Sequence, residues 1–445
     1  MYSGNVTWAI VSFLQEHCYY SLNNSLLPLE HLPTTTRPKS RIIFIDVLRA
    51  YAILMMLQGH FVDTLLAASY RNADSSLFSL WSFMRGMTAP IFFTVTGVVF
   101  TYLLLKDGRP LKENKRVKKG LRRGVFLLGI GYLLKINLPG LLFGYLSPWF
   151  WAVDVLHVIG LALIGLIAVT GLRELLGGSL ATWMIAFGVG TFLMDPFFTE
   201  NTWDHLPIVF AHYLTMDLGS NFTMVPWLGF AFFGGAIGYV LSKKSQWAFT
   251  HWFPALIMAF GITLTLGSWQ MLVNLYELTG WHYLPVLFNN NYLFWRLGHV
   301  FIVISLFMWV VPRIGTIPSL ITKIGSETLT IYGAHYVVLY GTWLGVGLSQ
   351  LIGYRSLDPL TCIVGAAAFV YAHIIFIKHI ETIRDFVYGQ IPTWGKRQYR
   401  LAMVWFKREW PKQREQLADR WEERLATGPS WLLPLVRVLA GRTKE

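Results

Sequence analysis

Residues 41–63 read RIIFIDVLRAYAILMMLQGHFVD, an apolar stretch interrupted by Asp46, Arg49, His60 and Asp63. About 20 apolar residues make one transmembrane helix, so the stretch predicts a first membrane span. Arg49 and His60 are eleven residues apart, which places both on one face of a helix, roughly 16 Å apart along its axis. Ionisable side chains at membrane depth are costly and mark functional sites, although a polar packing contact between helices is the alternative.

The composition is that of a polytopic membrane protein. Of the 445 residues, 54% are hydrophobic and 14% are charged, whereas soluble domains carry about 25% charged residues. Basic loops explain the net charge of +13 better than nucleic acid, so no nucleic-acid partner is expected. Cys18 and Cys362 are too few for a disulfide framework, and no histidine pair has metal-ligand spacing, so no metal is expected. No secretory signal is visible, and the first span is expected to direct membrane insertion.

The hydropathy pattern predicts an all-α integral membrane helix bundle of about ten transmembrane helices. A kink is expected at Pro90 in the second span, and the glycines of 232–238 indicate close helix packing rather than a nucleotide loop. The aromatic segment 138–152 is expected at the interface, and Lys135 is not counted as a site residue because its side chain can snorkel to the interface. The expected spans are 42–69, 78–105, 121–137, 153–172, 179–198, 223–242, 253–275, 292–312, 320–345 and 359–379.

Loop charges predict the orientation of the bundle. The segment 106–123 carries nine Lys and Arg residues, whereas 138–152, 199–222 and 276–291 carry none. By the positive-inside rule, the basic segment and both termini are cytoplasmic. We therefore expect a multi-pass protein of the cell (inner) membrane.

Three parts of the chain differ in character. Residues 1–40 predict an N-terminal cytoplasmic or interfacial segment, and residues 41–380 form the membrane domain. Residues 381–445 predict a basic amphipathic tail lying on the cytoplasmic leaflet.

Polar side chains from four further spans are expected to converge with those of the first. An isolated charge in hydrocarbon costs several kcal/mol, so several such groups at similar depths predict a polar cavity. The residues are Arg85 in the second span, Asp154 and His157 in the fourth, Arg296 and His299 in the eighth, and Glu327 and His335 in the ninth.

Several segments resemble the transmembrane acyltransferases, a superfamily that includes the acyltransferase-3 proteins and the heparan-α-glucosaminide N-acetyltransferase group. FIDVLRAYAILMMLQGH, with Arg49 and His60 flanking ten residues, resembles their first helix, and RGMTAPIFFTVTGVVFTYLL resembles their second. WAVDVLHVIGLALI and IGSETLTIYGAHYVVLYG resemble two later segments. The resemblance covers roughly 41–380 and is closest to bacterial proteins with the heparan-α-glucosaminide N-acetyltransferase domain. The lysosomal member of that group has no histidine matching His60, so its exact substrate is not implied.

The resemblance implies transfer of an acyl group, in the first place acetyl, from cytoplasmic acyl-CoA to a sugar or glycan hydroxyl or amine at the outer side. His60 would be the general base, Arg49 would position a phosphate or the thioester carbonyl, and Asp46 would orient Arg49. The cofactor phosphates would bind Arg122, Arg123 and Lys119, although topology alone also places cations there. The acceptor would be bound by Arg85, Asp154, His157, Arg296 and His299, with Glu327 and His335 as second-rank candidates.

Two other classes of function compete with this interpretation. A proton-coupled transporter or flippase also needs intramembrane histidine, arginine and aspartate, although no matched half-sequences indicate an inverted repeat. A membrane scaffold acting through its basic loop and tail would leave the intramembrane polar residues unexplained. The sequence leaves open which acceptor and which acyl group are used. It also leaves open whether transfer is direct or passes through an acyl-enzyme, and whether the protein is a homo-oligomer.

Overall fold

The computed structural model describes residues 42–106 and 108–390, with scattered positions between 403 and 423. Within these residues the regular structure is helical, with two isolated β-bridges and no β-strand. The predicted segment 1–40 and most of the predicted tail 381–445 lie outside the described residues.

Eight stretches of the described residues are long and apolar enough to cross a membrane, which confirms the predicted all-α polytopic bundle. Two of them are helix pairs interrupted by a single residue. The eight are α2 (Ile43–Leu65), α3 with α4 (Ser76–Gly86 and Thr88–Leu105), α7 (Val155–Leu176), α8 with α9 (Leu180–Leu193 and Asp195–Glu200), α11 (Met224–Lys243), α12 (Trp252–Thr279), α14 (Tyr292–Val310) and α18 (Pro359–Lys378).

The other two predicted spans form helices that are less regular or less apolar than the eight. The span expected at 121–137 becomes α5 (Lys115–Leu133), whose first half is basic. The span expected at 320–345 becomes α15 (Ser319–Ser326), α16 (Thr328–His335) and the π-helix η6 (Tyr336–Tyr340), with a break at Glu327. Both still pack in the bundle, α5 against α7 and α15 against α2.

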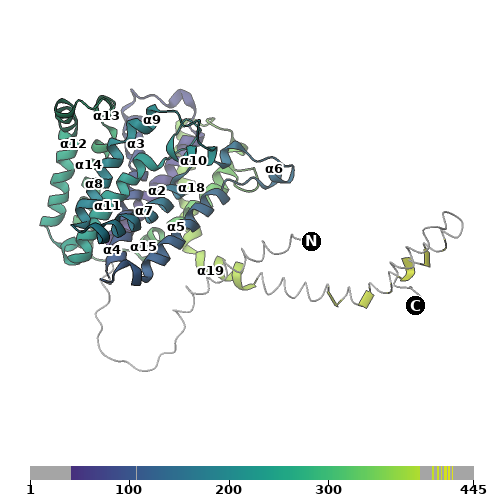
Figure 1. Cartoon of the computed structure of the whole chain (residues 1–445). Helices are drawn as coiled ribbons and strands as arrows, with labels where there is room; N and C mark the ends of the chain where they lie inside the picture. Colours follow the sequence, from purple (N-terminus) through teal and green to yellow (C-terminus); the bar gives the residue numbers. More distant parts are fainter. Residues whose placement is uncertain are drawn as a thin grey trace. The chain divides into compact units, whose positions relative to one another are not determined.

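Short helices connect the spans at the two ends of the bundle (Figure 1). We call the end that carries the basic 106–114 connection the basic end, and the other the opposite end. The connections at the opposite end contain α6 (Leu138–Leu142), α10 (Ile208–Leu214), α13 (Leu284–Asn290) and α17 (Leu348–Ile352). At the basic end, α18 is followed by α19 (Ile380–Arg384) and the π-helix η7 (Asp385–Gln390).

The second span breaks at Met87 rather than at Pro90. A proline ring clashes with the carbonyl group four residues earlier, which belongs here to Gly86, the last residue of α3. The break therefore begins one turn before the proline that causes it.

Glycines bring α4 and α11 into close contact. A Cβ atom built on Gly97 would lie 1.9 Å from the carbonyl oxygen of Ala231, and one built on Gly234 would lie 1.9 Å from that of Thr94. Small residues allow membrane helices to approach this closely. The structure thus confirms the packing role predicted for the glycines of 232–238.

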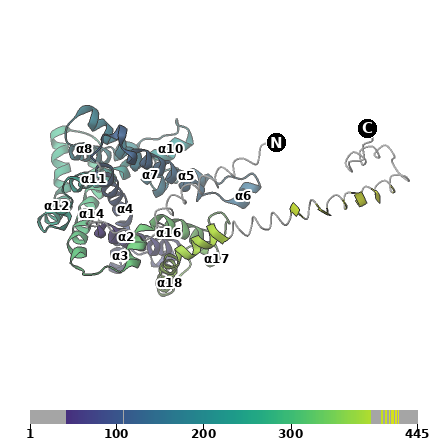
Figure 2. The same cartoon turned by 90° about the horizontal axis from the view of Figure 1, so that it is seen from below.

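The first span, α2, is packed on several sides. It contacts α4, α14, α15, α16 and α18, and Figure 2 shows it between α4 and the α16–α18 region. Leu57 and Phe61 of α2 join one apolar cluster with Ile331 and Phe369. This central position lets the polar residues of α2 face the interior of the bundle.

Candidate active site

One cavity runs along most of the length of α2, and we call it the central cavity. It encloses about 950 Å³ and is lined by α2 from Arg49 to Thr64 and by α3 and α4 from Arg85 to Leu103. Arg49 and Thr64 are separated by fifteen helical steps, roughly 22 Å, which is most of the thickness of a membrane hydrocarbon core. The central cavity therefore reaches from the basic end of the bundle toward the opposite end.

Polar side chains mark the central cavity at the basic end. Arg49, Arg123 and Thr328 all line it there, and the Arg49 guanidinium donates to the Thr328 hydroxyl at 2.9 Å. Arg123 comes from α5 and is exposed. Two guanidinium groups at one mouth suit a ligand that carries phosphate or carboxylate groups.

The middle of the central cavity has mainly apolar walls. They come from α4, α5 and α7, with two hydroxyl groups of α4 among them. Such walls suit a chain with few charges rather than a second charged group. The apolar lining residues are Phe92, Val95, Val99, Phe100, Leu103, Leu127, Ile159 and Leu163.

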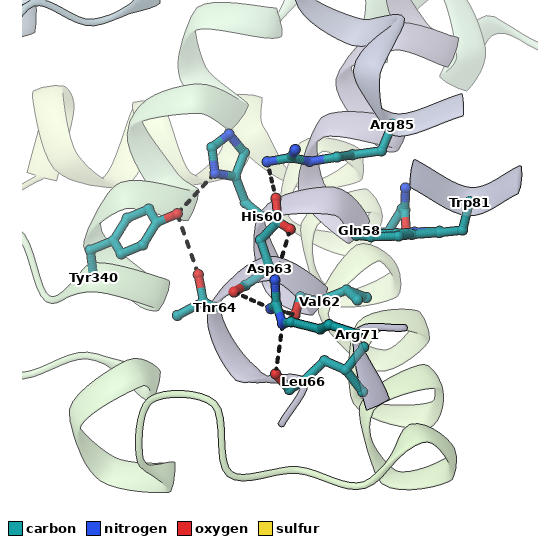
Figure 3. Close-up of polar contacts among 10 residues, drawn as sticks. All are labelled: Gln58, His60, Val62, Asp63, Thr64, Leu66, Arg71, Trp81, Arg85 and Tyr340. Carbon is teal, nitrogen blue, oxygen red and sulfur yellow. Dashed lines mark hydrogen bonds and ion pairs between the residues drawn. The ribbon is translucent and has the colours of Figure 1, made fainter. Parts of the chain in front are cut away.

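His60 lines the central cavity one turn before Thr64. Its Nδ1 atom lies 2.8 Å from the hydroxyl oxygen of Tyr340, and its ring centre lies 5.2 Å from that of His335. Figure 3 shows the imidazole between Tyr340 and the guanidinium of Arg85. An imidazole in a cavity wall is suited to proton transfer, because one ring nitrogen can accept a proton while the other is held by a hydrogen bond.

Asp63 connects two arginines next to His60 (Figure 3). Its carboxylate forms an ion pair with Arg85 and lies 3.5 Å from a guanidinium nitrogen of Arg71. Arg71 also donates to three backbone carbonyl groups near the end of α2, which fixes it in place. A Cβ atom on Gly59 would lie 2.9 Å from Cγ of Arg85, so the glycine lets Arg85 cross α2 beside His60.

A second carboxylate, Asp154, lines the central cavity from the start of α7. It is 6% exposed and accepts hydrogen bonds from the hydroxyl groups of Tyr332, at 2.8 Å, and Tyr336. Such bonds satisfy a buried carboxylate. Lys135 also lines the cavity and is 6% exposed, with its ammonium group 5.3 Å from the Trp149 ring centre. Lys135, which the sequence analysis did not count as a site residue, is therefore buried in the wall of the cavity.

Aromatic rings surround the central cavity at the opposite end. Amide and hydroxyl groups lie among them, so this chamber offers flat faces for stacking together with neutral hydrogen-bonding groups. The lining residues of this kind are Trp149, Phe222, Trp227, Tyr292, Trp343 and Tyr354, with Asn137, Ser147, Asn221 and Gln350.

Five of the predicted site residues line the central cavity: Arg49, His60, Arg85, Arg123 and Asp154. Three predicted partners of the basic end do not. Asp46 is buried where α2 meets α15, and a Cβ atom on Gly325 would lie 1.9 Å from its carbonyl oxygen. Lys119 and Arg122 are exposed on α5.

Three other predicted residues make packing contacts outside the cavity lining. His157 is fully buried, accepts a hydrogen bond from the backbone N–H of Asp154 and makes an edge-on ring contact with Tyr132. Arg296 donates to a backbone carbonyl at the end of α3 and lies against three aromatic rings. His299 forms a hydrogen bond of 2.8 Å between its Nδ1 atom and the carbonyl oxygen of Trp295 in its own helix. Their predicted role in acceptor binding has no support from the cavity lining.

Glu327 and His335 occupy opposite parts of the broken ninth span. Glu327, at the break, accepts hydrogen bonds from both terminal nitrogens of Arg384, at 3.0 and 2.6 Å. His335 is fully buried and does not line the central cavity, but its ring contacts four residues that do. These residues are His60, Tyr332, Tyr336 and Tyr340.

Sequence reasoning missed the tyrosines of the ninth span. Tyr332, Tyr336 and Tyr340 recur every four residues, a spacing that aligns them along one helix face, and all three line the central cavity. That repeat was visible in the sequence. Its partners, Asp154 and His60, lie more than 170 residues away and could not be read from it.

The sequence of the chain matches the model of a known protein family. A family model described as heparan-alpha-glucosaminide N-acetyltransferase, catalytic, matches residues 41–278, more than half of the chain. The chain belongs to this family. No curated protein matches the chain. The protein is thus a multi-pass member of a membrane N-acetyltransferase family, and the matched residues contain Arg49, His60, Arg85, Arg123 and Asp154.

The matched region of this N-acetyltransferase family ends within α12. The helices that follow, α14 to α18, complete the walls of the central cavity with Thr328 and the three tyrosines. Among the described residues, no group of three His, Cys, Asp or Glu side chains could hold a metal ion.

Proposed function

We propose that the protein transfers an acyl group, in the first place acetyl, from acyl-CoA to a sugar or glycan acceptor across the membrane. The observation that carries this proposal is the central cavity, which connects the guanidinium groups of the basic end to His60 and the aromatic chamber. The donor and the acceptor would enter from different ends and meet at His60.

The donor fits the basic end and the middle of the central cavity. Arg49 and Arg123 would bind the CoA phosphates, since guanidinium groups pair with phosphate through two parallel hydrogen bonds. The apolar walls suit the pantetheine arm, which carries no net charge. This arrangement would bring the thioester to His60 from the side that loop charges predict to be cytoplasmic.

The acceptor fits the aromatic chamber. Tryptophan and tyrosine rings such as Trp149, Trp343 and Tyr354 offer apolar faces to a sugar ring, and the surrounding amides can bond its hydroxyl groups. The chamber lies at the end that is predicted to face outward. We therefore propose acceptors of the cell envelope rather than cytoplasmic ones.

The chemistry requires one proton acceptor at the meeting point. His60 would take the proton from the acceptor hydroxyl or amine as the oxygen or nitrogen attacks the thioester carbon. The new C–O or C–N bond replaces the C–S bond, and the departing thiolate takes the proton from the imidazolium. Arg85, paired with Asp63 beside His60, would stabilise the developing oxyanion. Because both substrates reach His60 in one cavity, we write the reaction as direct transfer.

A thiol-release assay tests the proposal. Detergent-purified protein is incubated with acetyl-CoA or succinyl-CoA and an envelope-sugar extract, next to a His60→Gln variant and a His205→Gln control, whose histidine is exposed at the opposite end. The proposal expects CoA release that needs both the extract and His60. Substrate movement in vesicles without CoA consumption would support a transporter instead, which a membrane-length cavity also suits.

A further inference from the structure

We propose that Tyr340 is a positioning residue for His60, whose hydroxyl holds the imidazole as the tautomer that leaves Nε2 free to accept a proton. This inference rests on the proposed function, in which His60 is the general base.

The contacts of the imidazole define its two nitrogens differently. Nδ1 lies 2.8 Å from the Tyr340 hydroxyl oxygen, and the ring is held between an edge contact with Tyr340 and a tilted contact with the fully buried His335. Among the described residues, no hydrogen bond to Nε2 occurs. The nitrogen bonded to the scaffold is therefore Nδ1, and the nitrogen left for chemistry is Nε2.

Two donors converge on the Tyr340 oxygen in this arrangement. The Thr64 hydroxyl donates to it from 3.5 Å, and in the tautomer that we propose the Nδ1–H group, 2.8 Å away, is the second donor. A tyrosine oxygen accepts such bonds without carrying charge. When Nδ1 carries the hydrogen of a neutral imidazole, Nε2 has the free electron pair that a general base needs.

The backbone also defines the position of Tyr340. Tyr340 ends the π-helix Tyr336–Tyr340, a rare type of turn that is frequent at functional sites. Gly341 follows with a φ angle of +70°, and a Cβ atom there would lie 2.2 Å from the carbonyl carbon of Val346. The tight turn at Gly341 thus sets where the π-helix ends and where the Tyr340 hydroxyl points.

Other charged or titratable groups also face His60, and each of them can influence a pH profile of the activity. Arg85 of α3 and Asp63 of α2 lie beside it. The carboxylate of Asp154, at the start of α7, interacts with it electrostatically, and His335 of α16 contacts its ring. Tyr340 differs from all of them because it alone bonds the imidazole directly. Removal of its hydroxyl leaves those charges in place.

The test compares Tyr340→Phe, which removes only the hydroxyl, with Tyr371→Phe on the exposed side of α18. We expect kcat of Tyr340→Phe to fall about 10- to 100-fold. A loss of this size is typical when a metal-bound histidine loses the hydrogen bond to its other ring nitrogen. KM for acetyl-CoA should not change, and the midpoint of the kcat–pH profile should move. Tyr371→Phe should match wild type in all three readouts.

A spectroscopic readout separates positioning from general damage. In ¹⁵N spectra of histidine-labelled protein, with His60 assigned by its loss in His60→Gln, the wild type should show a protonated Nδ1, and Tyr340→Phe a mixture of tautomers. A wild-type spectrum with protonated Nε2 overturns the inference even if Tyr340→Phe does not fold. A Tyr340→Phe protein with unchanged kcat and pH profile also overturns it, provided that His60→Gln is inactive. An active His60→Gln protein instead overturns the proposed function.

Discussion

Arg49 and Thr328, 279 positions apart in the chain, are joined by a hydrogen bond of 2.9 Å at the basic mouth of the central cavity. Thr328 follows Glu327, which holds Arg384 of α19 through two hydrogen bonds. Lys323, one turn before Glu327, pairs with Glu381 of α19 at 3.0 Å. The mouth that would bind the donor is thereby connected to the segment that leads into the C-terminal tail.

Replacement of the cavity-lining arginines should weaken donor binding. A hydrogen bond to a charged group contributes about 1.5–3 kcal/mol, so Arg49→Gln or Arg123→Gln should raise KM for acetyl-CoA about 10-fold or more. Arg122→Gln is the matched comparison, because Arg122 neighbours Arg123 on α5 but does not line the cavity. Steady-state kinetics with varied acetyl-CoA measures the three effects. Equal increases for Arg122 and Arg123 would mean that general positive charge, not the cavity, attracts the donor.

The Glu327–Arg384 pair should support the same mouth indirectly. Arg384→Gln or Glu327→Gln should raise KM for acetyl-CoA by no more than about fivefold, because partly exposed pairs contribute about 0.2–1 kcal/mol. The exchange Glu327→Arg with Arg384→Glu restores an ion pair and should recover most of the loss. A double variant whose KM is no lower than that of Glu327→Arg or Arg384→Glu alone would show that the pairing itself is unimportant.

Asp154 should be required for the stability of the bundle. Asp154→Asn replaces the charged acceptor of the Tyr332 and Tyr336 hydroxyl groups with a neutral one, and a hydrogen bond to a charged group contributes about 1.5–3 kcal/mol. Thermal unfolding in detergent should show a large fall in Tm. Asp358→Ala, which removes the side-chain cap of α18, should cost only about 1 kcal/mol. Similar Tm values for both variants would contradict the buried network.

Close contact between α4 and α11 should make Gly97 intolerant of any side chain. Gly97→Ala places a methyl group against the Ala231 carbonyl and should lower the free energy of unfolding by about 1–3 kcal/mol. Gly129→Ala is the control, since a Cβ atom there meets nothing within 4 Å and alanine favours the helix by up to about 1 kcal/mol. Equal unfolding temperatures of the two variants would contradict the close contact between α4 and α11 at Gly97.

The fold was predictable because membrane spans are read from local hydropathy. The two less regular predicted spans contain features that hydropathy does not resolve: α5 has a basic first half, and the ninth span breaks at Glu327. The break at Met87 lies three residues from the kink predicted at Pro90, since its cause, a proline ring, is local as well. What hydropathy could not show was which helices touch, because that depends on contacts between distant segments.

The candidate site was predictable only in part. Arg49 and His60 share a face by helical periodicity alone, and both line the central cavity. His157, Arg296 and His299 have equally suggestive positions in the sequence, yet each bonds to a backbone group and none lines the central cavity. A polar residue in a span must bond to something, and its sequence does not reveal whether that partner is a ligand or a neighbouring helix.

The sequence by itself determined the helical spans, the asymmetry of charge between the two ends and the alignment of Arg49 with His60, because each follows from residues close together in the chain. The tertiary structure decided which polar residues face the central cavity, placed Tyr340 on His60 and Asp154 between two tyrosines, and connected Thr328 to Arg49. These contacts join segments up to 280 positions apart. They depend on helix rotation and on one π-turn, which are set by the packing of the whole bundle.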